Sequence, residues 1–319
     1  MKQCTFITLL ILCFSFISET TEAKAYTVEN TYKKLIKQYP NITIPAQENA
    51  ADVSIKKDLV YKTINQQALT LNLFAPKQQQ GPLPLIVLVH GGGWRTGTPA
   101  LFNALASRLA QNGFVVATPS YRLSGVAAFP AAIYDINDAL TWLKTNHQDF
   151  AIDLNHIALG GGSAGGQIAA LLAYSNGQLK QQAVQATSAN VQALINIDGL
   201  SDFASDEALP FENDPSKKVT SASAWLGGRY EQVPERWHSA SPINYITDEA
   251  PATLFINSSV PRFRAGRDAA IVALKKHQVT NQTYQFADAP HSFWLFDPWL
   301  DETVEIMSEF LTAQLKGQN

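Results

Sequence analysis

Short runs of consecutive apolar residues alternate with amphipathic segments along most of the chain. A continuous apolar run is typical of a strand buried on both faces, and apolar residues at every third or fourth position are typical of a helix that covers a sheet. The strand-like segments are residues 82–89, 114–118, 157–159, 191–197, 252–256 and 283–286, and the helix-like segments are residues 101–111, 131–146, 269–276 and 302–315. This alternation predicts an α/β fold with a mostly parallel sheet and helices on both of its faces.

Two parts of the chain depart from this alternation. Residues 53–64 and 68–74 are joined only by the polar turn Asn65-Gln66-Gln67, so we expect them to form an antiparallel pair that opens the sheet. Residues 199–250 are too irregular for another strand–helix unit and contain aromatic residues such as Trp225 and Trp237. We expect this segment to be a cap insertion over the strand ends, where its aromatic residues either line a substrate site or pack the cap onto the domain.

The first residues have the layout of a signal peptide. Lys2 precedes an apolar stretch from Phe6 to Ile17, and polar and small residues follow as far as Ala25. We expect cleavage after Ala25, which predicts a secreted or periplasmic protein whose residues 26–319 form a single domain. Both cysteines lie within residues 1–25, so the mature chain is expected to contain no disulfide and no thiolate metal site.

The charge of the chain restricts the classes of partner. The net charge is −3, and the acidic and basic residues are mixed without long runs of one sign. Such a balance is not typical of proteins that bind nucleic acid or anionic membrane surfaces. No apolar run after the expected signal peptide is long enough to span a membrane. We therefore expect neither nucleic acid nor a membrane span.

A serine lies where a strand, a sharp turn and a helix are expected to meet. The sequence Gly161-Gly162-Ser163-Ala164-Gly165 follows the apolar run 157–159 and precedes an apolar segment of helical character. Small residues on both sides of Ser163 allow the chain to turn tightly and to present the hydroxyl at the end of the sheet. A serine hydroxyl is a poor nucleophile, so it needs a base within hydrogen-bonding reach and a carboxylate that orients the base. Ser163 is thus a candidate nucleophile.

A second glycine-rich sequence ends an upstream strand. His90-Gly91-Gly92-Gly93-Trp94 directly follows the apolar run 82–89. Glycines at such a position bring backbone N–H groups close to a substrate carbonyl. The N–H groups of Gly91 and Gly92, together with that of Ala164, are therefore candidates for an oxyanion hole. We expect the His90 ring to support this loop rather than to act as a base.

The base is expected directly after the last strand of the sheet. Of the six histidines, His291 alone meets this condition, because it follows the run 283–286 by a few residues. The other histidines lie in loops, at a helix end or in residues 199–250. His291 is therefore the candidate general base.

These motifs resemble the esterase/lipase superfamily of α/β-hydrolases, in its secreted bacterial branch. The nearest resemblance is to the bifunctional deacetylase and feruloyl esterase-like group, which includes xylan and pectin deacetylases. It covers the chain from Val53 to its end and rests on His90-Gly91-Gly92-Gly93-Trp94, on the elbow around Ser163 and on Pro290-His291-Ser292-Phe293-Trp294. The resemblance implies the α/β-hydrolase fold, with Ser163 as nucleophile, His291 as base, and Gly91, Gly92 and Ala164 as oxyanion donors.

The carboxylate that should orient His291 departs from the family pattern. Most relatives carry an aspartate shortly after the strand that corresponds to residues 252–256, but here no acidic residue appears before Asp268. Asp268 begins the next helix, where the helix dipole already favours an acid. Asp198 ends the preceding strand, whose tip neighbours the histidine loop. We favour Asp198 as the acid, with Asp268 as the alternative.

The resemblance and the signal peptide together predict a secreted serine carboxylic-ester hydrolase that acts through an acyl-enzyme and needs no cofactor or metal. The expected substrate is a small ester or an acylated plant cell-wall polysaccharide that carries acetyl or feruloyl groups. A general short-chain esterase or lipase and a serine exopeptidase on the same fold are the alternatives among enzymes. A catalytically inactive glycan-binding protein is the alternative outside that class, although the intact Ser163 and His291 argue against it.

Overall fold

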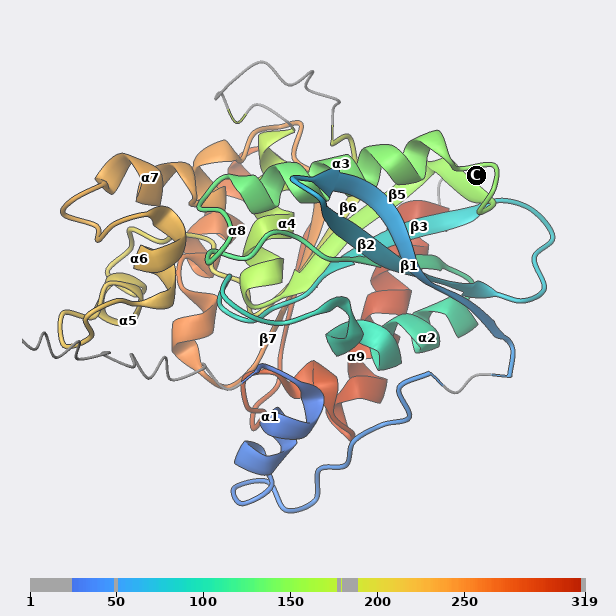
Figure 1. The fold of residues 1–319 in the computed structure, drawn as a ribbon, viewed down its shortest axis with the longest axis horizontal. Coiled ribbons are helices and arrows are strands. Elements are labelled where there is room, and N and C mark those ends of the chain that lie inside the picture. Colours follow the sequence, from blue (N-terminus) through green and yellow to red (C-terminus); the bar gives the residue numbers. More distant parts are fainter. Residues whose placement is uncertain (1–24, 49–50, 177–178, 180–188, 317–319) are drawn as a thin grey trace, which may run out of the picture.

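A computed structural model describes residues 25–48, 51–176, 179 and 189–316, so the expected signal peptide lies outside the described residues except for Ala25. In this part of the chain, eight strands form one sheet in the order β1-β2-β4-β3-β5-β6-β7-β8 (Figure 1). Their bounds are β1 Val53–Ile64, β2 Gln67–Pro76, β3 Leu83–Val89, β4 Val115–Pro119, β5 Ile152–Gly162, β6 Ala193–Ile197, β7 Ala252–Asn257 and β8 Asn281–Gln285. The pairings of β2 with β1 and with β4 are antiparallel, and the other pairings are parallel. The predictions of an opening antiparallel pair and a mostly parallel sheet are confirmed.

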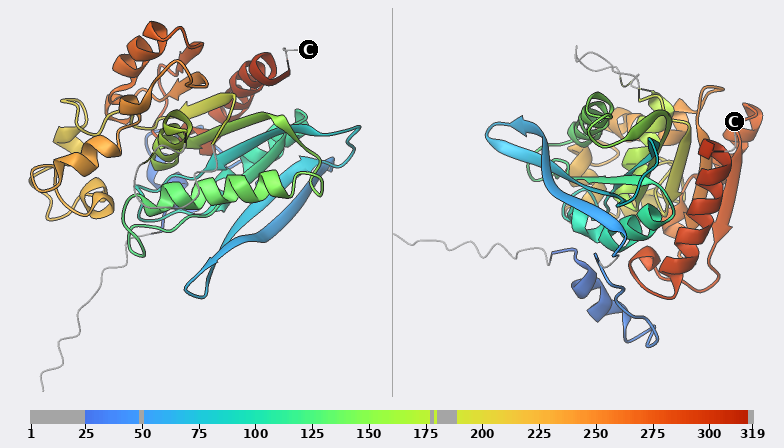
Figure 2. Two further views of the ribbon diagram at one scale, coloured as in Figure 1. Left: turned by 90° about the horizontal axis from the view of Figure 1, so that it is seen from above. Right: turned by 90° about the vertical axis from the view of Figure 1, so that its right-hand side faces the viewer.

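Helices cover both faces of the sheet (Figures 1 and 2). The helices α3 Ala131–Thr145, α4 Ala164–Ser175 and α8 Arg267–Lys276 contribute to the core on one face, and α2 Asn103–Gln111 and α9 Trp299–Leu311 contribute to the core on the other. In β3, Leu85 and Val87 belong to the first core and Ile86 and Leu88 to the second. The central strands are apolar without interruption because both of their faces are buried.

The segment between β6 and β7 contains the short helices α5 Leu209–Glu212, α6 Ser221–Leu226 and α7 Pro234–Ser239. They gather beyond one end of the sheet (Figures 1 and 2). Trp225 is fully buried and stacks on Trp94, with ring centroids 5.0 Å apart and planes inclined by 11°. Trp237 is also fully buried. Both residues therefore pack this segment onto the domain, which is the second of the two expected alternatives, and neither lines the cavity at Ser163.

A buried glutamine also joins this segment to the domain. Gln167 of α4 accepts a hydrogen bond from Trp94 Nε1 (3.0 Å) and donates one to the carbonyl of Ala240 (2.8 Å). Because α4 begins directly after Ser163, these bonds link the position of the segment to that of the candidate nucleophile.

The ends of the chain differ from the sequence-based expectation. Helix α1 (Val28–Leu35) was not predicted; it begins after Thr27, whose side chain accepts a hydrogen bond from the Asn30 N–H. The expected helix 302–315 begins earlier, at Trp299, and α9 ends at Leu311 before a short π-helical turn, Thr312–Lys316. These shifts are of the size expected at helix ends, where the apolar pattern fades.

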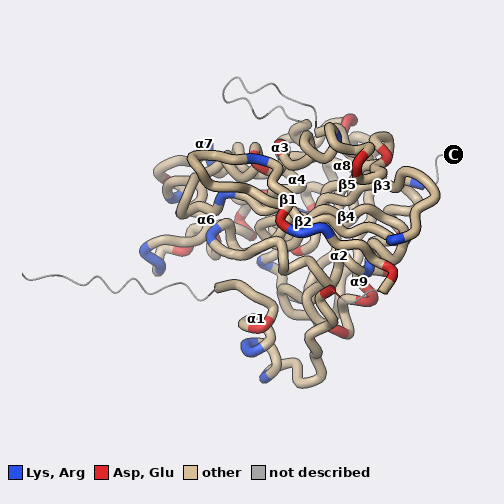
Figure 3. The backbone as a smooth tube through the Cα atoms, turned by 45° about the vertical axis from the view of Figure 1, so that its right-hand side comes forward, with Lys and Arg blue, Asp and Glu red and all other residues tan. Residues whose placement is uncertain are grey.

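Acidic and basic residues are interspersed along the chain (Figure 3). Over the described ranges, no helix combines the length and the apolar character that crossing a membrane requires.

Candidate active site

The turn between β5 and α4 holds Ser163 in a strained conformation. Its backbone has φ 56° and ψ −124°, a combination that residues other than glycine rarely adopt. The turn depends on Gly165, because a β-carbon there would lie 1.9 Å from the carbonyl oxygen of Val89. A hydrogen bond from the Ser163 N–H to the carbonyl of Ile197 (2.8 Å) fixes the turn against β6. The serine hydroxyl is thus presented at the carboxyl end of the parallel strands, as the sequence predicts.

The structure brings Ser163, His291 and Asp198 together. His291 Nε2 lies 3.0 Å from Ser163 Oγ, and His291 Nδ1 lies 2.9 Å from Asp198 Oδ2. The Asp198 side chain is fully buried, and the His291 side chain is 20% exposed. In this arrangement Nδ1 donates to the carboxylate, which leaves Nε2 free to accept the serine proton. The geometry is that of an activated nucleophile with an oriented base.

The orientation of the Asp198 carboxylate is fixed by further donors. Its Oδ1 atom accepts hydrogen bonds from the Ser258 N–H (2.8 Å) and from Asn257 Nδ2 (3.3 Å). Both donors lie at the end of β7, next to the strand that Asp198 follows. With Oδ1 occupied, Oδ2 is held toward His291.

Asp268 lies apart from His291. Its side chain is 73% exposed in the first turn of α8 and accepts a hydrogen bond from Arg267 Nε (2.8 Å). Arg267 in turn donates to Asn257 Oδ1 (2.9 Å). Asp268 therefore has a structural environment, and Asp198 is the carboxylate that contacts the imidazole.

The loop after β7, where the family resemblance predicts the acid, supplies an aromatic ring instead. Phe263 lies in the short 3-10 helix Pro261–Arg264 and stacks on the His291 ring, with centroids 3.4 Å apart and planes inclined by 8°. Trp294 contacts the same imidazole edge-on at 5.3 Å. The two aromatic rings restrict the rotation of His291. Neither contact was predicted from the sequence.

A cavity of about 90 Å³ reaches Ser163. Its wall includes Gly93, Ala164, Glu212, Arg262 and Phe263. Ala164 is the first residue of α4, so its N–H has no carbonyl one turn earlier to which it can donate. The N–H of Ala164 can therefore bind an anion that forms at a carbonyl held against Ser163.

The glycine loop contributes to this cavity through Gly93, which sequence reasoning did not include among the donors. Gly91 lies against the elbow, since a β-carbon there would be 2.8 Å from the carbonyl oxygen of Gly162. Gly92 has φ 123°, a conformation that favours glycine. The loop thus approaches Ser163 closely with bare backbone, and its candidate donors extend from Gly91 and Gly92 to Gly93.

His90 supports the glycine loop, as expected. Its Nδ1 donates to the carbonyl of Gly91 (2.9 Å), and its ring stacks on Tyr121 with centroids 4.4 Å apart. Burial lowers the pKa of His90 to about 4. The ring is therefore neutral near pH 7, and it contacts the loop rather than the serine.

Tyr26 joins the two loops that flank the serine. Its hydroxyl forms a hydrogen bond with Ser292 Oγ (2.7 Å), directly after His291, and its N–H donates to Thr96 Oγ1 (3.3 Å) beyond the glycine loop. Burial raises the pKa of Tyr26 to about 12, so the phenol stays protonated. Sequence reasoning missed this residue, which is the first after the expected cleavage point.

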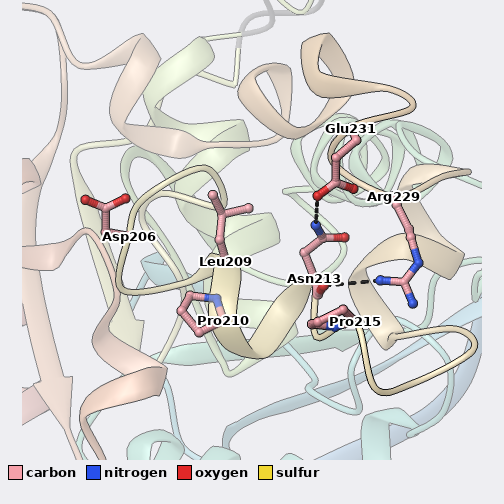
Figure 4. Close-up of a pocket in the computed structure, with 7 residues that line it drawn as sticks. All are labelled: Asp206, Leu209, Pro210, Asn213, Pro215, Arg229 and Glu231. Carbon is pink, nitrogen blue, oxygen red and sulfur yellow. Dashed lines mark hydrogen bonds between the residues drawn. The ribbon is translucent and has the colours of Figure 1, made fainter.

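A second cavity of about 520 Å³ lies within the segment that connects β6 to β7, and Asp206, Leu209 and Arg229 contribute to its wall (Figure 4). Asn213 donates to Glu231 Oε1 (2.7 Å) and accepts through its carbonyl from Arg229 Nη1 (3.2 Å). No triad residue lines this cavity. Throughout the described residues, no group of three or more histidine, cysteine or acidic side chains is placed to hold a metal ion.

Residues 71–261, more than half of the chain, match the model of the BD-FAE family. The chain belongs to the BD-FAE family. The matched range contains both glycine motifs and Asp198 but ends before His291.

This BD-FAE family member is similar to two mycobacterial proteins. It is 31% identical to Esterase LipC of Mycobacterium tuberculosis over 184 residues, which are 56% of this chain and 44% of LipC. It is 27% identical to Esterase LipQ of the same organism over 236 residues, which are 72% of this chain and 55% of LipQ. The chain therefore spans about half the length of the curated relatives it matches.

Solved structures share the fold. A truncated form of a carbohydrate esterase from gut microbiota superposes with a TM-score of 0.71 at 20% identity and covers 86% of this chain and 100% of that one. Esterase B from Lactobacillus rhamnosis superposes with a TM-score of 0.68 at 21% identity and covers 91% of this chain and 95% of that one. At these identities the likeness shows the fold alone, and the predicted α/β-hydrolase fold is confirmed.

Proposed function

We propose that the protein is a secreted serine carboxylic-ester hydrolase that removes short acyl groups, acetyl above all, from plant cell-wall polysaccharide. The observation that carries the proposal is the contact chain from Ser163 Oγ through His291 to Asp198 at a small cavity. The esterase names of LipC and LipQ support an ester bond as the target.

The reaction follows from the positions of these atoms. His291 Nε2 takes the proton of Ser163 Oγ as the oxygen attacks the ester carbonyl carbon. The N–H of Ala164 and those of the glycine loop hold the resulting oxyanion. His291 then gives the proton to the departing alcohol, and an acyl-enzyme remains on Ser163. Water attacks the acyl-enzyme in the same way, which releases the acid and returns the proton to Ser163.

Asp198 has an electrostatic part in both halves of this reaction. Its buried carboxylate faces Nδ1, so it stabilises the imidazolium that forms when Nε2 is protonated. Ser258 and Asn257 also donate to this carboxylate, which keeps it turned toward Nδ1 in both halves.

The polysaccharide substrate rests on two supports. One solved relative is a carbohydrate esterase from gut microbiota, and another is a bifunctional GH43-CE of Bacteroides eggerthii. The signal-peptide layout of residues 1–25 would deliver the enzyme to the place where such polymers are found. The size of the cavity favours a small acyl group, because sites for drug-sized ligands enclose about 300 to 1,000 Å³.

The test is a substrate panel with the purified protein and its Ser163→Ala variant. Acetylated xylan, acetylated pectin, methyl ferulate and a triglyceride are incubated with each, and the acid released is quantified. We expect acetate from xylan or pectin with the natural protein and none with the variant. Hydrolysis of the triglyceride alone would refute the polysaccharide substrate. Equal acid release by the two proteins would refute the serine mechanism.

A further inference from the structure

A charged pair forms part of the wall of the cavity at Ser163. Arg262 Nη2 donates to Glu212 Oε1 at 3.0 Å. The Glu212 side chain is 9% exposed and the Arg262 side chain is 34% exposed. Both residues line the cavity together with Ser163 and Ala164. An ester carbonyl held at Ser163 would therefore have charged groups within the same small space.

The pair is held in a fixed position by its surroundings. The Arg262 guanidinium lies over the rings of Phe211 and Phe263, 5.2 Å and 4.6 Å from their centroids. The carbonyl of Glu212 accepts a hydrogen bond from Thr220 Oγ1 (2.5 Å), which fixes the end of α5. Because Phe263 also stacks on His291, the pair is connected to the catalytic base through a single ring.

Stability alone does not account for this pair. Arg262 Nε is buried and has no hydrogen-bond partner among the described residues. A buried donor without a partner is costly, and an ion pair that is largely removed from water seldom stabilises a fold more than apolar residues of similar size. Two apolar residues would stabilise the fold at least as much, which indicates that the charges act in the cavity.

The size of the cavity indicates what that role is. The cavity of about 90 Å³ is small beside the ~300 to 1,000 Å³ of sites for drug-sized ligands, so a short acyl group is the one that it accommodates with least contact with the pair. An acyl chain that extends into the part of the cavity next to the pair would remove water from the guanidinium and the carboxylate. Burying each methylene in an apolar pocket ordinarily improves binding by about fourfold, but against charged groups this gain is lost.

We propose that Glu212 and Arg262 select acetyl over longer acyl groups by forming a polar end wall of the acyl pocket. This inference rests on the proposed ester hydrolysis at Ser163. It also separates the two acyl groups that the sequence leaves open, since a polar wall disfavours the aromatic ring of a feruloyl group.

The test compares kcat/KM for p-nitrophenyl acetate, butyrate and hexanoate in the natural protein and in a Glu212→Leu/Arg262→Leu double variant. Both charges are removed together because a single substitution would leave the other charge without its partner. We expect the natural protein to prefer acetate. In the double variant, the ratio of butyrate to acetate should rise by about 15-fold, from two methylenes at about fourfold each.

The matched control is Arg264→Leu. Arg264 lies in the same short helix as Arg262, but it donates outward to Gln285 Oε1 (2.5 Å). We expect the chain-length profile of this variant to equal that of the natural protein. A profile that changes as much as in the double variant would show that the loop, and not the charged pair, sets the preference.

Two further results would overturn the inference. One is a folded double variant whose ratio of butyrate to acetate is unchanged. The other is a natural protein that hydrolyses hexanoate as fast as acetate, which decides the matter even if the double variant does not fold. Failure of the proposed function itself would be distinct, because p-nitrophenyl acetate would then be hydrolysed equally by the natural protein and by Ser163→Ala.

Discussion

Replacing Asp198 by asparagine should remove the function of His291 while leaving its position unchanged. In the natural protein, Oδ1 accepts from the Ser258 N–H and from Asn257 Nδ2, and Oδ2 accepts from His291 Nδ1. The amide oxygen of the Asp198→Asn variant must take the place of Oδ1, because two donors face that position. The amide NH₂ group then faces Nδ1, which has to become an acceptor. His291 consequently carries its proton on Nε2, where it cannot accept the proton of Ser163.

The expected loss is large for so small a change. A wrong imidazole tautomer lowers kcat by about 10³ to 10⁴, which corresponds to about 4 to 5.5 kcal/mol of lost transition-state stabilisation. The fold should persist, since the amide has the shape of the carboxylate and keeps the bonds at Oδ1. The loss should therefore appear in kcat without a comparable loss in thermal stability.

The assay is steady-state hydrolysis of p-nitrophenyl acetate, together with thermal unfolding of each variant. The matched control is Asp268→Asn, because Asp268 is 73% exposed and contacts Arg267 rather than His291. We expect this control to retain activity within about twofold and to lose about 0.3 to 1 kcal/mol of stability at most. The assignment of Asp198 fails if its variant keeps kcat within tenfold of the natural protein, or if Asp268→Asn is equally impaired.

Three further predictions concern the same site. His291→Ala should reduce kcat about as much as Ser163→Ala, and the double variant should have nearly the same kcat as either, because the two residues act as a unit. A reduction in the double variant equal to the product of the two single reductions would show that another residue activates the serine. Gly165→Ala should prevent stable folding, since its β-carbon would lie 1.9 Å from the carbonyl oxygen of Val89; a melting temperature within a few degrees of the natural value would contradict this. Burial lowers the pKa of His90 from 6.5 to about 4, so between these pH values the unfolded chain binds a proton that the folded protein does not. As the pH falls over that interval, the free energy of unfolding, measured in urea, should decrease by about 3 kcal/mol more in the natural protein than in a His90→Asn variant. Parallel pH profiles of the two proteins would refute this prediction.

The sequence predicted the parts of the site that depend on local structure. The elbow around Ser163 could be recognised because a tight turn between a strand and a helix requires small residues such as Gly165 at fixed places. The central strands could be recognised because burial on both faces makes them continuously apolar. His291 could be found by its place after the last strand of the sheet.

Other parts depend on contacts between distant segments, which no local pattern encodes. The Tyr26 hydroxyl meets Ser292 across a separation of 266 residues. Phe263 contacts His291 from the loop where an acid was expected, and no sequence motif around Phe263 marks it as part of the site. The choice between Asp198 and Asp268 was open for the same reason. Asp198 ends an apolar strand and Asp268 begins a helix, and only the packing of β6 beside β7 places one of them at the imidazole.

The central claim is that Ser163 is the nucleophile, and covalent labelling tests it most directly. The protein is treated with an organophosphonate until p-nitrophenyl acetate hydrolysis stops, and the modified residue is located by mass spectrometry of proteolytic peptides. The account predicts one phosphonyl group per chain on Ser163, with much slower labelling in the His291→Ala variant because Nε2 no longer takes the serine proton. A label on a different serine, or complete inhibition without modification of Ser163, would contradict it.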